Sequence, residues 1–175
     1  WGEIDLAAIT HNVGLLRERA GRPVSILAPV KANAYGHGMA AVSLHLQKLG
    51  VEGLATANFD DAVAARRAGV TIPILLYGAQ LPSGHVDVLD QGLTPSVYDR
   101  ESLQVLAQLG SRRANPVPVH IKVDAGLGRL GVRLDEAAAF AHEVLQQPGL
   151  LLEGIYPHIP FSDDQTGAWS PRRWM

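Results

Sequence analysis

The chain has 175 residues, with 15 Lys plus Arg against 17 Asp plus Glu, seven His and no Cys. A net charge of −2 gives no basic surface for a nucleic-acid backbone or an anionic membrane, so neither partner is expected. Without cysteine there is no disulfide, thiolate zinc site or iron–sulfur cluster, and we expect a cytoplasmic protein. No apolar run has the length of a signal-peptide core or a membrane span. Chemistry on a small molecule is therefore the expected function.

Short runs rich in Val, Ile and Leu alternate along the chain with longer segments of helical spacing. This alternation predicts repeated βα units and a parallel sheet. Asp60, Asp99 and Asp135 are expected to cap the helices that they begin. In chain order we expect a helix over 5–20, a strand over 24–31, a helix over 40–49, a strand over 53–57, a helix over 59–68, a strand over 73–77, a helix over 82–91, a strand over 93–97, a helix over 99–109, a strand over 117–124, a helix over 135–147 and a strand over 151–156.

Six strands with helical crossovers fit either an open parallel sheet or most of a (β/α)8 barrel, and periodicity does not distinguish the two. No GxGxxG turn follows the first strand, which disfavours a dinucleotide-binding open sheet. The segment HIPFSDDQTGAWSPRRWM after the sixth strand predicts no closing helix or strand. A barrel built from this chain would therefore be incomplete, with about six strands and two open edges.

Lys31 ends the apolar segment VSILAPVK, at the carboxyl end of a strand, where α/β folds place their chemistry. Burial there would favour the neutral amine, the nucleophile that forms a Schiff base with a carbonyl compound. The alternative interpretation is a strand-end lysine that only reaches solvent.

The segment ANAYGHG after Lys31 predicts a tight turn at Gly36 and Gly38. Such a turn would return Tyr35 toward Lys31, where its phenol could bond a ligand phosphate. His37 is expected to order the loop through backbone hydrogen bonds.

A second polar cluster is predicted in VHIKVDAGLGRLG, where His120, Lys122 and Asp124 share one face of a strand. The glycine-rich turn that follows would bring Arg129 beside the strand end. Two neighbouring cations require an anion between them, either a bound group or a chemically modified lysine. The alternative is a salt-linked network of Lys122, Asp124 and Arg129 that only stiffens the loop.

His158 follows the sixth strand, and its ring could stack on, or hydrogen-bond to, a flat cofactor. The alternative is a structural histidine. Asp163 and Asp164 are expected in a solvated loop or a helix cap, without the histidine-rich surroundings of a transition-metal site. We therefore expect no metal.

Four segments resemble, in order, the alanine racemases, which are pyridoxal-phosphate enzymes with a barrel domain followed by a β-domain. VKANAYGHG at 30–38 resembles the cofactor-lysine signature of the family, and EIDLAAITHN at 3–12 resembles its opening. KVDAGLGRLG at 122–131 is similar to its KxDTGMxRxG segment, and EGIYPHIPFSDD to its histidine-containing strand. The resemblance implies that residues 1–175 are the amino-terminal part of a pyridoxal-phosphate-binding (β/α)8 TIM barrel without the β-domain.

By this resemblance, Lys31, Tyr35, Arg129 and His158 would bind pyridoxal 5'-phosphate. Lys31 would hold the cofactor as a Schiff base and then act as one of two acid/base groups. Tyr35 would bond the phosphate, Arg129 would face the phenolic oxygen, and His158 would stack near the pyridine ring. Lys31, Arg129 and His158 are the expected catalytic residues. Lys122 matches a lysine that is often carbamylated in the family, which would supply the anion between the two cations.

The resemblance implies a homodimeric racemase that interconverts L-alanine and D-alanine, with D-alanine supplied to cell-wall peptidoglycan. Its second base is a tyrosine from the partner subunit's β-domain, which has no counterpart in this chain. Pro157 stands where the family has Thr or Ser, and Ala125 and Leu127 stand where Thr and Met are commoner. We therefore expect little or no activity from this chain by itself.

Two alternatives remain open. One is a non-catalytic barrel protein that binds pyridoxal phosphate. The other is a phosphosugar-type barrel enzyme in which Lys31 forms a Schiff base directly with its substrate, and retention of the cofactor would exclude it.

Overall fold

The computed structural model describes residues 2–21 and 23–159, and the expected loop residues Asp163 and Asp164 lie outside these ranges. The chain divides into two compact units, Trp1–Ser96 and Val97–Met175. Each unit combines parallel strands with helices, as the alternating sequence pattern predicts. Within the described ranges, no helix is both long and apolar enough to cross a membrane.

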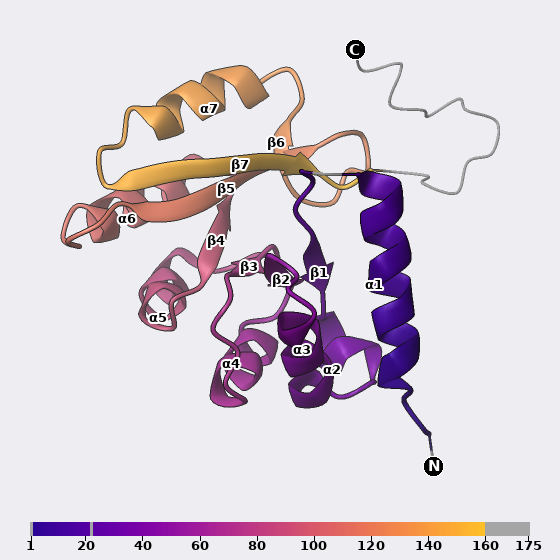
Figure 1. Cartoon of the computed structure of the whole chain (residues 1–175). Coiled ribbons are helices and arrows are strands. Elements are labelled where there is room, and N and C mark those ends of the chain that lie inside the picture. The colour runs from indigo at the N-terminus through magenta and orange to yellow at the C-terminus, as the bar shows by residue number, and fades with distance from the viewer. Residues whose placement is uncertain (1, 22, 160–175) are drawn as a thin grey trace. The chain divides into compact units, whose positions relative to one another are not determined.

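The first unit alternates strands and helices along the chain (Figure 1). Strands β1 to β4 pair in parallel in sequence order, with Ala28 beside Leu54 and Leu54 beside Ile74. The elements are α1 (Leu6–Ala20), β1 (Leu27–Pro29), α2 (Lys31–Tyr35), α3 (Met39–Lys48), β2 (Gly53–Thr56), α4 (Phe59–Arg67), β3 (Ile74–Leu76), the 3-10 helix η1 (Pro82–Gly84), α5 (His85–Asp90) and β4 (Thr94–Val97).

The second unit contains α6 (Arg100–Gly110), β5 (Val117–Asp124), β6 (Val132–Arg133), α7 (Ala137–Leu145) and β7 (Leu150–Pro157). Strand β5 pairs in parallel with both β6 and β7, and α7 lies along β7 (Figure 1). Val119 lies beside Leu152, whereas His120 lies beside Gly154, so Glu153 is the extra residue of a β-bulge. All six expected strands are present, and the two-residue β6 is an addition that the sequence did not predict.

Helix caps confirm one expectation and correct two. Asp99 begins α6, and its carboxylate accepts the Ser102 N–H at 2.7 Å, as expected. The expected cap at Asp60 is wrong, because Asn58 begins α4 and its side chain accepts the Asp60 N–H at 2.7 Å.

The expected cap at Asp135 is also wrong. Its carboxylate instead pairs with the Arg133 guanidinium at 2.9 Å, and α7 begins only after Glu136. The short spacing between these opposite charges favours a local ion pair over the helix terminus.

The core of the first unit is an apolar cluster that joins the strands to the surrounding helices, with Leu54, Ile74 and Leu76 completely buried. Beside it, the Arg66 guanidinium of α4 donates to four backbone carbonyl groups, those of Val70, Ile72, Gln91 and Gly92. Burial lowers the pKa of Arg66. The four acceptors satisfy this charged group and tie α4 to the segments that lead into β3 and β4.

Candidate functional site

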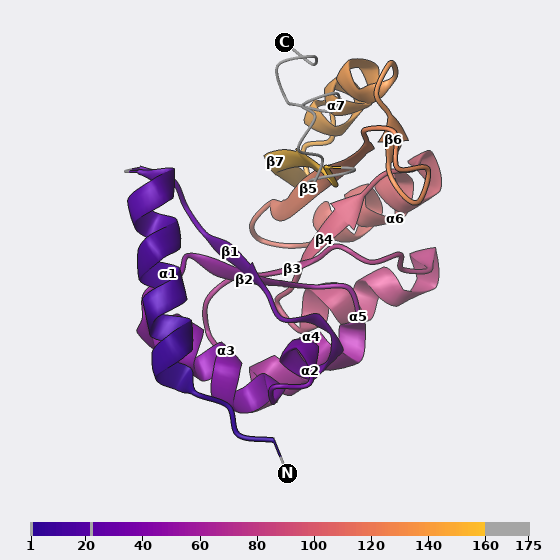
Figure 2. The ribbon, with the colours of Figure 1, turned by 90° about the vertical axis from the view of Figure 1, so that its right-hand side faces the viewer.

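Lys31 lies where the chain leaves the carboxyl end of β1 and enters α2 (Figure 2). Val30 is 2% exposed, and its N–H donates to the Ala55 carbonyl of β2 at 2.9 Å. Of the two alternatives for Lys31, the structure shows the exposed side chain, because Val30 takes the interior position. Its Nζ lies 5.7 Å from the centre of the Tyr35 ring. The structure thus brings these two predicted residues together.

The chain after Lys31 forms a left-handed helical turn. Ala32, Asn33, Ala34 and Tyr35 have φ between 53° and 56°, although none of them is glycine. This conformation costs an L-residue other than asparagine roughly 1–2 kcal/mol, so Ala32, Ala34 and Tyr35 together cost on the order of 3–6 kcal/mol. A tight turn was expected at Gly36 and Gly38, but it begins earlier and in residues that resist it. Other contacts must hold it.

Two side chains far apart in the sequence hold this turn. The Asp61 carboxylate of α4 accepts the Ala32 N–H at 2.7 Å and the Asn33 N–H at 3.3 Å. The Asn33 side-chain oxygen accepts the Met39 N–H, at the start of α3, at 2.7 Å. The His37 N–H donates to the Ala34 carbonyl at 3.0 Å, which confirms the backbone role expected of His37. Asp61 and Asn33 were not predicted, because no local pattern links residue 61 to residue 32.

Lys122, near the end of β5 in the second unit, is only 4% exposed. Burial lowers the pKa of Lys122, the charge of Arg129 lowers it further, and the charge of Asp124 opposes both. Of Lys31 and Lys122, it is therefore Lys122 that is buried. The effect of Arg129 on the pKa of Lys122 has the direction expected of two neighbouring cations.

The loop after β5 is organised by Asp124. Its carboxylate accepts the Gly126 N–H at 3.0 Å and the Gly128 N–H at 2.9 Å. These backbone donors hold the pKa of Asp124 below its usual value, with Gly128 contributing most. Gly126, Gly128 and Gly131 all have positive φ. The expected glycine-rich turn is present, and Arg129 lies within it with an exposed side chain.

Tyr156 of β7 belongs to the Lys122 cluster, although it was not among the residues predicted from the sequence. The Lys122 Nζ lies 4.7 Å from the centre of the Tyr156 ring, within range of a cation–π interaction. The His120 ring meets the Tyr156 ring edge-on at 6.2 Å between centres. A Cβ on Gly154 would lie 2.8 Å from the His120 ring nitrogen, so the glycine leaves room for the ring in this orientation. The alternation of side chains between the two faces of β7 was the sequence signal that could have identified Tyr156.

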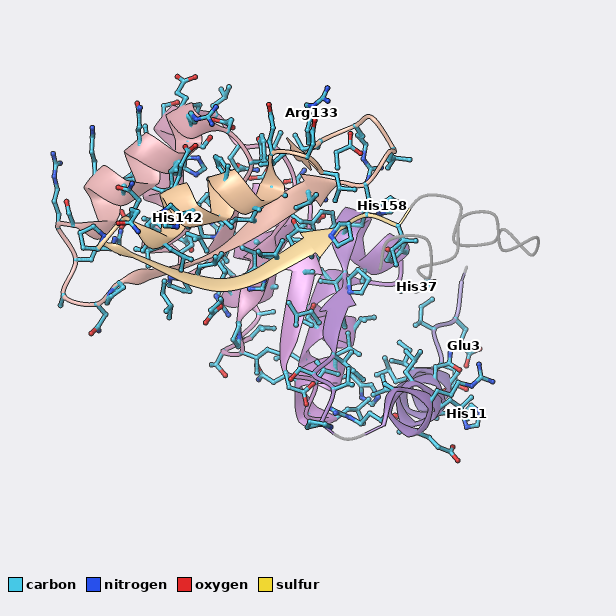
Figure 3. The ribbon with its side chains drawn as sticks, turned by 90° about the horizontal axis from the view of Figure 1, so that it is seen from above. Glu3, His11, His37, Arg133, His142 and His158 are labelled. Atoms are coloured by element: carbon cyan, nitrogen blue, oxygen red, sulfur yellow. The ribbon has the colours of Figure 1, made fainter. Side chains whose placement is uncertain are left out.

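His158 follows the end of β7 and is exposed (Figure 3). Lys31 and Tyr35 belong to the first unit, and Lys122, Arg129 and His158 belong to the second. In both units the predicted residues thus follow the carboxyl ends of parallel strands or lie near them, where α/β folds bind ligands.

A family model described as "Alanine racemase, N-terminal domain" matches residues 4–171. The chain belongs to this family. It is 35% identical over 174 residues to an alanine racemase of Halothermothrix orenii, covering 99% of this chain and 46% of the relative. It is 38% identical over 176 residues to one of Desulforamulus reducens, covering 100% and 47%. The chain thus spans about half the length of the curated relatives it matches.

Solved structures agree. An alanine racemase from E. faecalis matches with a TM-score of 0.87 at 33% identity, covering 95% of this chain and 45% of the other. One from Clostridium difficile 630 matches with a TM-score of 0.87 at 29% identity, covering 93% and 45%. A histidine racemase from Leuconostoc mesenteroides matches with a TM-score of 0.77 at 25% identity, covering 87% and 41%. The predicted fold class, an incomplete α/β barrel of (β/α)8 type, is confirmed by these neighbours and by the parallel strands.

Proposed function

We propose that the chain is the amino-terminal part of a pyridoxal-phosphate-dependent amino-acid racemase whose substrate is alanine. The observation that carries the proposal is the position of Lys31 just after the carboxyl end of β1, with its amine beside the Tyr35 ring and an unusual turn after it. Membership of the family and relatives named alanine racemase support it. In the whole cytoplasmic enzyme, a homodimer, D-alanine would be made for cell-wall peptidoglycan.

The chemistry of the residues present fits pyridoxal phosphate. The exposed primary amine of Lys31 would hold the cofactor by condensing with its aldehyde, which releases one water, and the O–H of the exposed Tyr35 would donate a hydrogen bond to the phosphate. Arg129 and His158 would add a cation for the phenolic oxygen and a flat ring for the pyridine. When bound, the cofactor withdraws electrons from the α-carbon of an amino acid and makes its proton acidic. Lys31 would then carry that proton on one face.

Lys122 would complete the electrostatics of the site as a carbamate. Because its pKa is lowered by burial and by Arg129, a larger fraction of this amine is neutral and nucleophilic than for an ordinary lysine. The amine nitrogen would bond the carbon of carbon dioxide and release one proton. The resulting anion would replace the repulsion between Lys122 and Arg129 with an attraction.

The site can be tested by reducing the chain with borohydride in the presence of pyridoxal phosphate and mapping the labelled peptides by mass. Among the side chains, only Lys31, Lys48 and Lys122 can carry the label. We expect one equivalent on Lys31, and none at that position in Lys31→Ala, while Lys48→Ala serves as the matched control with full labelling. Label spread over Lys48 and Lys122, or no label, would contradict the proposal.

A non-catalytic cofactor-binding role is the second candidate, because inversion needs a base on each face of the α-carbon and the residues proposed here supply one, Lys31. The two can be separated by incubating L-alanine and D-alanine, each by itself, in deuterated water. One base suffices to exchange the α-proton, whereas inversion needs a base on each face. We expect α-deuterium in the one enantiomer whose proton faces Lys31, and little formation of the opposite enantiomer from either substrate. If Lys31 takes the label in the borohydride experiment but the unreduced chain exchanges no α-proton, the chain is a binding protein only.

A further inference from the structure

The turn after Lys31 has fixed anchors on both sides. Val30, just before the lysine, is buried and bonded to β2 through its N–H. Ala34, three residues after it, is 2% exposed, and its N–H donates to the Val30 carbonyl at 2.9 Å. Between these anchors, the N–H groups of Ala32 and Asn33 have one carboxylate as their acceptor, that of Asp61. The backbone on which Lys31 stands is therefore bonded directly to α4.

Asp61 is well placed for this contact. It lies in the first turn of α4, which Asn58 begins, and its side chain is half-buried. The hydroxyl of the fully buried Thr56 lies 3.5 Å from the same oxygen that accepts the Ala32 N–H. Asp60, its neighbour in the same turn, is exposed. The two aspartates thus offer the same charge at the same helix terminus, but only the Asp61 carboxylate accepts the N–H groups of the Lys31 turn.

We propose that Asp61 is the positioning residue for Lys31. Its carboxylate fixes the left-handed turn, and this turn fixes the position of the Lys31 amine beside the Tyr35 ring. This inference rests on the proposed function of Lys31. Without the carboxylate, Ala32 and Asn33 lose the contact that offsets their unfavourable φ angles, and the turn relaxes toward right-handed or extended backbone. The Lys31 amine and the Tyr35 ring then move apart, and the cofactor loses its contact with one of these two groups.

The test compares Asp61→Ala and Asp61→Asn with Asp60→Asn in the same chain. The first readout is the rate at which pyridoxal phosphate becomes borohydride-fixed on Lys31, with Lys48 as the internal reference. We expect Asp61→Ala to slow labelling of Lys31 by about tenfold or more, because small misplacements of a reacting group have effects of this size. Asp61→Asn, which keeps one oxygen, falls between. Asp60→Asn, which removes the same helix-terminal charge, labels like the parent chain.

The second readout is amide hydrogen exchange at Ala32 and Asn33, measured without cofactor. We expect protection in the parent and in Asp60→Asn, and its loss in Asp61→Ala, while the β2 and β3 amides stay protected and show that the first unit is folded. Adding Ala32→Gly to Asp61→Ala should recover part of the labelling rate, because glycine adopts positive φ without steric cost. A variant that is merely unfolded would show no such recovery.

The outcomes separate the two proposals. If Lys31 of the parent chain takes no label although Ala32 and Asn33 are protected, the proposed function fails. If the parent is labelled and Asp61→Ala is labelled at the same rate, or loses labelling only in proportion to lost protection in β2 and β3, the positioning role of Asp61 is overturned and the proposed function stands.

Discussion

Lys31 and Lys122 both lie at the carboxyl end of a parallel strand and both precede a loop tied to an aspartate, yet the two loops are built in opposite ways. The Lys31 loop forces four non-glycine residues into left-handed backbone beside an exposed lysine. The Lys122 loop places glycines at its positive φ angles, beside a lysine that is 4% exposed. The backbone conformation of the Lys31 loop is therefore unfavourable for its residues, whereas that of the Lys122 loop is favourable for its glycines.

The aspartates that hold the two loops also differ, in how far along the chain each lies from its loop. Asp124 belongs to the strand that precedes its loop, and it accepts N–H groups two and four residues ahead. Asp61 comes from a different helix, 29 residues after Ala32. One loop is therefore specified by adjacent residues, whereas the other exists only when β1 and α4 are already packed together. We expect the Lys31 loop to be the more sensitive to distant substitutions and the Lys122 loop to local ones.

Glycine substitutions in the Lys122 loop should have the largest effect. A Cβ at Gly131 would collide with the Asp124 backbone nitrogen, and its φ is 141°. We expect Gly131→Ala to lower the free energy of unfolding by about 3 kcal/mol, because steric overlap adds to backbone strain. Gly128 has φ of 70°, and a Cβ added there would meet no atom within 4 Å, so Gly128→Ala should cost only about 1 kcal/mol. Urea unfolding of both variants measures the difference, and equal losses would refute the steric account.

The same contrast explains how far the sequence could be interpreted. Local patterns predicted the strands, the glycine turn after Asp124 and the cap at Asp99, because each depends on neighbouring residues. They missed the hand of the Lys31 turn and the role of Asp61, since both depend on contacts between segments distant in sequence. They also left open whether Lys31 is buried or reaches solvent. Which face of a strand end points inward depends on the local backbone, and Val30 occupies the inward position before Lys31.

Alanine-to-glycine substitutions should have opposite signs in left-handed and right-handed turns. Ala32 and Ala8 are both exposed, but Ala32 has φ of 53°, whereas Ala8 lies in the regular helix α1. Ala32→Gly should raise the free energy of unfolding by about 1 kcal/mol, because it removes left-handed strain. Ala8→Gly should lower it by about 1 kcal/mol, the usual cost of glycine within a helix. Thermal and urea unfolding test the pair, and a loss of stability in both would show that the Lys31 turn is not strained.

The smallest effect concerns the pH dependence of the Lys122 loop. The Gly128 and Gly126 N–H groups lower the pKa of Asp124 in the folded chain, so its ionised form binds the loop more tightly than its protonated form. A lowered folded-state pKa means that this stabilisation is fully present above the unfolded-state value of about 3.9 and is lost as the pH falls through the folded-state pKa. The amide proton shifts of Gly126 and Gly128 should therefore titrate together, with a midpoint below that of an exposed aspartate. Asp124→Asn should leave both shifts flat over the same range. If the two amide shifts change with pH in Asp124→Asn as they do in the parent chain, a group other than Asp124 controls the loop. The proposed contrast with the Lys31 loop, that residues adjacent in sequence hold the Lys122 loop, would then be wrong.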